Sequence, residues 1–135
     1  GRISLMIDIN DVDQMLVIPK LILQPVVENA IRHGLREKTG NGAVGIHVER
    51  LDDALEIVVI DDGVGMSEEQ VEQIRDVLEN QEIGVVDKEG RISVGMKNVY
   101  DRIRLNCGPE YGFTVQSAPG LGTSVTFRLP VWKEL

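Results

Sequence analysis

The sequence predicts an α+β fold, in which about three helices pack on one face of a mixed β-sheet of about five strands. Two observations predict it. Segments with the two-residue alternation of strands are mixed with amphipathic segments of helical period, and the two kinds do not alternate regularly along the chain. The chain has 135 residues, which fits one domain of ordinary size. We therefore expect residues 1–135 to form a single two-layer α/β sandwich.

The first half of the chain is predicted to run strand, helix, strand, strand. Residues 4–9 alternate as a half-buried strand does. Apolar residues recur at helical spacing over residues 21–34, where a terminal glycine supplies a stop signal. Residues 44–48 alternate again, and residues 55–60 are apolar enough to form a central strand.

The second half begins with a helix start at Ser67, because Gln70 three residues later completes a capping-box pattern. The inner face of this acidic helix is predicted to carry Val71, Ile74 and Leu78. Residues 80–93 have weak periodicity and mixed charge, which indicates a mobile loop. A further amphipathic helix buries Met96, Val99, Tyr100 and Ile103. It ends at Gly108, and two strands at 113–117 and 124–129 follow.

The composition excludes several classes of protein. Apolar residues make up 42% and charged residues 27%, as in globular rather than disordered chains. Apolar runs such as residues 57–60 fall far short of the roughly 20 residues of a membrane helix. A net charge of −8 argues against non-specific binding to nucleic acid or to an anionic membrane. Cys107 is the single cysteine and no signal peptide precedes the first strand, so we expect a reducing, cytoplasmic compartment.

Two polar segments lie at the ends of predicted apolar elements in the first half of the chain. Residues 28–34 lie late in the first helix, and polar side chains at i,i+4 spacing share one flank there. These pairs are Glu28 with Arg32 and Asn29 with His33. Residues 61–65 place two carboxylates and two glycines directly after a strand, where glycine lets backbone approach a ligand closely. Taken alone, the first segment also fits a solvated helix face and the second an ordinary loop.

Two further segments lie in the second half. Residues 95–98 begin a helix, whose free amides and dipole can hold phosphate while Lys97 adds charge. Residues 120–123 form a glycine-rich turn before the last strand. Alone, these segments also fit a capped helix and a plain turn. The order and spacing of all four segments together carry more information than any one of them.

Taken together, the four segments resemble the nucleotide-binding boxes of the Bergerat-fold (GHKL) ATPases, the superfamily of gyrase, the Hsp90 chaperone, histidine kinases and MutL. Residues 28–34 resemble the N box, residues 61–65 the G1 box, residues 95–98 a reduced G2 box, and Gly122-Thr123 the G3 position. Residues 23–34 are most similar to bacterial sensor histidine kinases of the LytS/YesM type. The resemblance extends from about residue 3 to residue 130.

The resemblance implies ATP and Mg²⁺ as ligands. Asn29 would coordinate Mg²⁺ through its side-chain oxygen, and Glu28 and Asn29 are the implied catalytic residues. Asp61 would accept a hydrogen bond from the adenine amino group, while Gly63 and Gly65 let the base lie against backbone. The other implied ATP-binding residues are Arg32, His33, Gly95, Met96, Lys97 and Thr123. Residues 80–93 would be the ATP lid.

The implied function is that of the catalytic domain of a bacterial sensor histidine kinase, cut from a longer protein anchored in the cell membrane. The γ-phosphate would pass to a histidine on a separate dimerisation domain and then to an aspartate on a response regulator. Neither His33 nor His47 is expected to be the phosphoacceptor. We expect a monomer that contacts neither nucleic acid nor the membrane directly.

Three alternatives stay open at the level of the sequence. The first is an ATPase of the same fold, in which Glu28 would act on water. The second is a serine kinase of the anti-sigma type. The third is a module that senses nucleotide without turnover.

Overall fold

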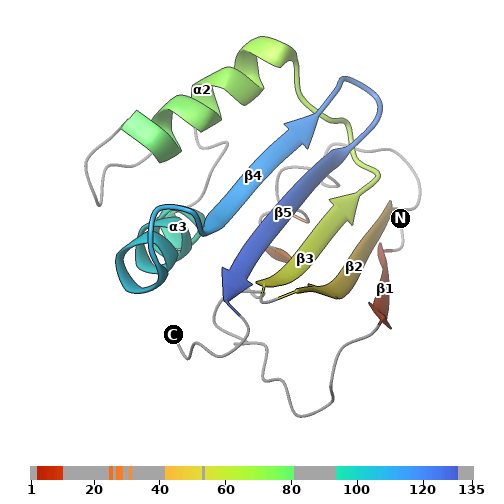
Figure 1. The fold of residues 1–135 in the computed structure, drawn as a ribbon. Coiled ribbons are helices and arrows are strands. Elements are labelled where there is room, and N and C mark those ends of the chain that lie inside the picture. The colour runs from red at the N-terminus through yellow and green to blue at the C-terminus, as the bar shows by residue number, and fades with distance from the viewer. Residues whose placement is uncertain are drawn as a thin grey trace.

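The computed structural model describes residues 3–10, 42–52, 54–80 and 94–130, together with residues 25, 27, 28 and 31. The elements are β1 (Ile3–Asn10), β2 (Gly42–Leu51), β3 (Ala54–Asp61), α2 (Glu68–Asn80), α3 (Val94–Cys107), β4 (Gly112–Ser117) and β5 (Thr123–Pro130). The strands form one five-stranded sheet in the order β1-β2-β3-β5-β4 (Figure 1). Only β1 and β2 pair in parallel among these neighbours. The predicted mixed sheet is therefore confirmed.

The core lies between this sheet and the helices. Buried residues alternate with more exposed ones along most of β2, β3, β4 and β5, so one face of the sheet is largely apolar. The buried apolar residues of that face are Val44, Ile46, Val48, Leu55, Ile57, Val59, Phe113, Val115, Val125, Phe127 and Leu129. Residues 55–60, predicted as a central strand, lie in β3 in the middle of the sheet, and Ile57 is 0% exposed.

The described helices α2 and α3 pack over the β4 and β5 part of the sheet, on the β4 side in Figure 1. The capping box predicted at the start of α2 is present, because Ser67 N donates to Gln70 Oε1 at 2.9 Å and Gln70 N donates to Ser67 Oγ at 3.2 Å. The predicted inner faces are also confirmed, since α2 buries Val71, Ile74 and Leu78, and α3 buries Met96, Val99, Tyr100 and Ile103. α3 ends before Gly108, whose φ is 116° and whose N–H donates to Arg104 O at 3.1 Å.

Two predicted segments fall mainly outside the described residues. Of the first predicted helix, the structure describes Pro25, Val27, Glu28 and Ile31, and all four are helical. Residues 81–93 of the predicted lid lie outside the described part of the chain, whereas residue 80 belongs to α2.

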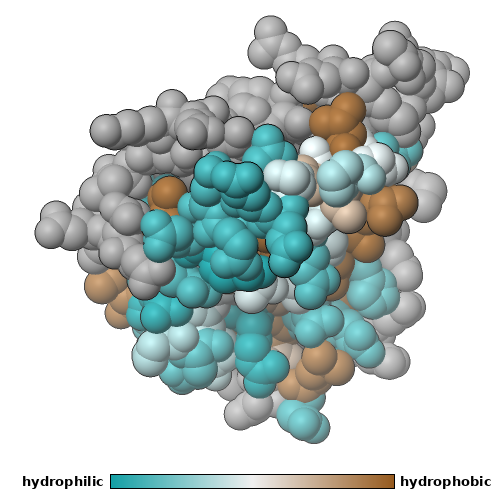
Figure 2. Space-filling model, turned by 90° about the horizontal axis from the view of Figure 1, so that it is seen from above, coloured by the Kyte–Doolittle hydropathy of each residue, from teal (hydrophilic) through white to brown (hydrophobic). Residues whose placement is uncertain are grey.

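The outer surface of α2 is strongly polar, and Figure 2 looks down on it. Its exposed charged residues are Glu68, Glu69, Glu72, Arg75, Asp76 and Glu79. Within the described residues, no helix combines the length and the apolar character needed to cross a bilayer.

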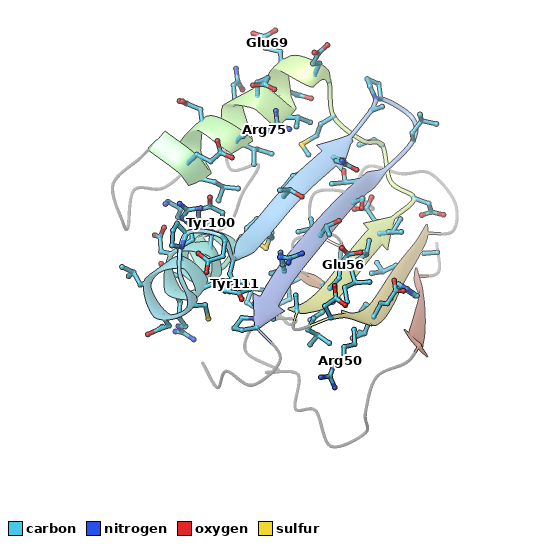
Figure 3. The ribbon with its side chains drawn as sticks, in the orientation of Figure 1. Arg50, Glu56, Glu69, Arg75, Tyr100 and Tyr111 are labelled. Carbon is cyan, nitrogen blue, oxygen red and sulfur yellow. The ribbon has the colours of Figure 1, made fainter. Side chains whose placement is uncertain are left out.

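Tyr100 gives the fold a pH dependence that can be measured. The residue is 4% exposed, its ring packs edge-on against Phe113, and its hydroxyl accepts a hydrogen bond from Arg104 Nη1 at 3.1 Å. Figure 3 shows the ring at the junction of α3 and β4, close to Tyr111. Burial raises the pKa of Tyr100 above its ordinary value of 10.0, an effect that the positive charge of Arg104 partly opposes.

We expect the free energy of unfolding to fall as the pH rises above the ordinary tyrosine pKa. The unfolded chain loses the Tyr100 proton first, so stability present below that pKa is lost as the pH rises through the folded-state value. Tyr100→Phe should flatten this alkaline decline, measured by urea unfolding at several pH values. The matched control is Tyr111→Phe, and an equal flattening in both variants would contradict the assignment.

Candidate functional site

Three polar side chains lie side by side at one end of the core, and we call them the polar row: Asp61, Ser117 and Thr123. Thr123 is paired across the sheet with Asp61 on one side and with Ser117 on the other. Each lies two residues from a buried apolar residue of its own strand, so all three share the face covered by the helices. In Figure 1 this is the end where the tips of β3 and β4 meet the start of β5.

Asp61 is held in place by the loop that follows β3. It is 5% exposed, and its Oδ1 accepts a hydrogen bond from Gly63 N at 2.9 Å. The next carboxylate, Asp62, accepts from Ala43 N at 2.8 Å, and Asp62 N donates to Ala43 O at 3.2 Å. These bonds tie the loop to the start of β2, so a buried carboxylate is presented in one orientation at the end of the sheet.

The loop after β3 packs backbone against backbone on the turn between β4 and β5. Gly65 has φ 71° and Gly122 has φ 76°, values that L side chains rarely adopt. A Cβ at Gly65 would lie 2.0 Å from Ala118 O, and a Cβ at Gly122 would lie 2.0 Å from Asp61 O. The two glycine segments predicted at residues 61–65 and 120–123 therefore form one compact unit.

Ser117 joins this unit together, and the sequence analysis did not single it out. Its Oγ accepts from Met66 N at 2.8 Å, donates to Gly122 O at 2.7 Å and lies 2.9 Å from Thr123 Oγ1. The signal that could have found it is pairing. Ser117 is the last residue of a predicted strand, and it stands opposite Thr123 once the two final strands are set in register.

The predicted phosphate-binding residues at the start of α3 lie in different environments. Gly95 is the second residue of the helix, as expected for a phosphate site at a helix N-terminus. Met96 is 1% exposed and packs in the core. Lys97 is also 1% exposed, and its Nζ lies 2.7 Å from Asp101 Oδ1, so its charge is matched inside the protein. A contact between Lys97 and phosphate stays a prediction.

The N-box residues are mostly outside the described part of the chain. Glu28 is described, and it is helical and exposed. Asn29, Arg32 and His33 lie outside the described residues. Of the predicted site residues, the structure therefore brings together Asp61, Gly63, Gly65 and Thr123.

The chemistry of the compact unit formed by residues 61–65 and 120–123 fits a nucleotide base that carries an amino group. A buried carboxylate accepts hydrogen bonds, and glycine, which has no side chain, lets a flat ligand approach the backbone closely. Within the described residues, no three His, Cys, Asp or Glu side chains gather into a metal site. A Mg²⁺ ion bound together with a nucleotide needs no such cluster, because one or two protein oxygens plus phosphates and waters complete its shell.

Known proteins resemble this chain over most of its length. YwpD of Bacillus subtilis is 32% identical over 130 residues, which are 96% of this chain and 42% of that protein. The sensor histidine kinase YesM of the same species is 29% identical over 134 residues, 99% of this chain and 21% of that protein. The chain thus spans less than half the length of these curated relatives.

The fold has counterparts among solved structures. The histidine kinase domain of the blue-light-activated histidine kinase EL346 from Erythrobacter litoralis superposes with a TM-score of 0.62 at 19% identity, covering 96% of this chain and 52% of that one. Residues 17–133 match the family described as histidine kinase-, DNA gyrase B-, and HSP90-like ATPase. Because this match covers most of the chain, the chain belongs to that ATPase family.

Proposed function

We propose that this chain binds ATP with Mg²⁺ and supplies the γ-phosphate to a histidine on a separate dimerisation domain. The observation that carries the proposal is the buried carboxylate of Asp61, fixed in a glycine loop that packs against Gly122. Membership in an ATPase family supports a nucleotide as the ligand.

In this proposal the polar row forms the base end of the site. Asp61 accepts a hydrogen bond from the adenine amino group, and Thr123, its cross-strand neighbour, lines the same end. The backbone at Gly63 and Gly65 lies against the base. Binding a base to this fixed carboxylate requires little reorganisation of the loop, because the loop is already hydrogen-bonded.

The phosphate end is proposed at the N box and at the start of α3. Arg32, His33 and the free amides near Gly95 would contact the phosphates, and Asn29 would hold Mg²⁺ through its side-chain oxygen. When bound, Mg²⁺ neutralises and orients the phosphates. Glu28, which is exposed on its helix, would act as a catalytic residue next to Asn29. Catalysis of phosphoryl transfer then consists mainly of positioning and electrostatic stabilisation.

The partners follow from the same proposal. Residues 1–135 would be one catalytic domain of a longer protein, which carries the phosphoacceptor histidine on a dimerisation domain. This protein would be a sensor kinase of the cell membrane with the present domain on the cytoplasmic side, and a response regulator would receive the phosphoryl group. The length of the curated relatives supports this, since YesM, a sensor histidine kinase by name, is covered to only 21%.

Calorimetric titration with a non-hydrolysable ATP analogue, with and without Mg²⁺, tests the site. In Asp61→Asn the amide keeps one oxygen for the Gly63 N–H but turns an NH₂ group toward the ligand in place of an acceptor. We expect binding to be lost in this variant. Asp62→Asn is the matched control, because Asp62 is exposed and neighbours Asp61 in the chain. Equal binding of the ATP analogue by Asp61→Asn and by the unsubstituted protein would refute the proposal that Asp61 recognises the adenine base.

A further inference from the structure

The hydroxyl of Ser117 has its full set of hydrogen-bond partners. A serine hydroxyl offers one proton and two lone pairs. The structure gives Ser117 Oγ three partners, namely Met66 N at 2.8 Å, Gly122 O at 2.7 Å and Thr123 Oγ1 at 2.9 Å. One donated and two accepted bonds would use this capacity completely.

The chemistry of the partners fixes the direction of each bond. Gly122 O is a carbonyl oxygen and can only accept, so it receives the single proton of Ser117. Met66 N–H can only donate, and it occupies one lone pair. In the third contact Ser117 has no proton left to give, so Thr123 must be the donor. The hydroxyl proton of Thr123 therefore points at Ser117, and Thr123 presents only lone pairs to anything else that approaches it.

We propose that Ser117 is a positioning residue that makes Thr123 an obligatory hydrogen-bond acceptor, and that this sets the base specificity of the nucleotide site. The proposal rests on the proposed function, because it assigns specificity to that same site. Thr123 stands directly opposite Asp61, whose carboxylate is also an acceptor. Directly paired residues on one face of a sheet have Cβ atoms about 5 Å apart, so the two acceptors serve one end of a ligand.

Two neighbouring acceptors favour a base edge that donates. Adenine carries a 6-amino group, which donates either to the protein directly or to a water held between the acceptors. Guanine and hypoxanthine carry a 6-oxo group there, and an oxo group facing acceptors leaves polar groups unpaired. If Ser117 is removed, the hydroxyl of Thr123 regains its rotation and can donate to a 6-oxo group. The site should then discriminate less between the two kinds of base.

Calorimetry with ATP and with inosine triphosphate on the purified chain tests this role. We expect the unsubstituted chain to prefer ATP, and Ser117→Ala to reduce the ratio of the two affinities by about tenfold. The ratio is the informative quantity, because general loosening of the site weakens both nucleotides alike. Ser124→Ala is the matched control. Ser124 follows Thr123 in β5 but lies on the opposite face of the sheet, so its removal should leave the ratio unchanged.

The possible outcomes separate this proposal from the proposed function. ATP binding with an unchanged ratio in Ser117→Ala would overturn the role of Ser117 and leave the nucleotide site intact. No binding of either nucleotide by the unsubstituted chain would overturn the proposed function, and this inference with it. If Ser117→Ala does not fold, Thr123→Val removes the acceptor oxygen of Thr123 itself while keeping the shape of the side chain. It should lower the ratio in the same direction, and an unchanged ratio there would also overturn the proposal.

Discussion

Gly65→Ala and Gly122→Ala are each expected to lower the free energy of unfolding by about 3 kcal/mol or more. Part of the loss comes from the left-handed backbone, which costs an L residue roughly 1–2 kcal/mol. The rest comes from overpacking, because the new Cβ would have to lie 2.0 Å from a backbone carbonyl oxygen in either variant. The carbonyl belongs to Ala118 in the first case and to Asp61 in the second, so neither can rotate aside as a flexible side chain would.

Gly120→Ala is the matched control for both. Gly120 has φ 78°, similar to the other two glycines, but a Cβ there would meet nothing within 4 Å. Its loss should therefore be about 1 kcal/mol, the cost of the backbone conformation alone. Urea unfolding of the three variants measures the difference. Equal losses at all three positions would show that close packing between the two loops contributes nothing, and would contradict the compact unit described above.

Both glycine loops were predicted as parts of a nucleotide site, but their contact with each other was not. Glycine in a sequence predicts backbone freedom, whereas the atom that a Cβ would meet belongs to a segment more than 50 residues away for Gly65. The same limit explains why Ser117 was missed. A single serine at the end of a strand forms no pattern, and its importance arises from Met66, which is 51 positions away in the sequence.

Features set by local sequence were predicted well. The capping box joins Ser67 to Gln70 within one turn of helix, and both of its hydrogen bonds are present. The buried faces of the strands and of α2 and α3 follow from the spacing of apolar residues, which depends only on the period of each element. Strand pairing could not be predicted from local sequence, because the parallel pairing of β1 with β2 is not encoded in either strand alone.

The burial of Lys97 leads to the second large effect that we expect. Its side chain is 2% exposed and that of Asp101 is 10% exposed, and their charged atoms are 2.7 Å apart across one turn of α3. Lys97→Met keeps most of the apolar volume but leaves a buried carboxylate without its ammonium group. We expect a loss of about 3 kcal/mol in the free energy of unfolding, as is typical when one partner of a buried ion pair is removed.

The exposed pair of Glu72 and Arg75 on α2 provides the comparison, because it too joins residues one turn apart, but its side chains are 61% and 45% exposed (Figure 3 shows Arg75). Arg75→Met should cost no more than about 0.5 kcal/mol, since water screens an exposed pair. Lys97→Met combined with Asp101→Leu should recover most of the stability lost by Lys97→Met alone, because no uncompensated charge remains. A Lys97→Met protein as stable as the parent but unable to bind ATP would contradict this structural role and favour the phosphate contact that the sequence predicts for Lys97. A destabilised variant that still binds ATP with parental affinity would show that Lys97 stabilises α3 and does not contact phosphate. The N box and the amides at the start of α3 would then bind the phosphates.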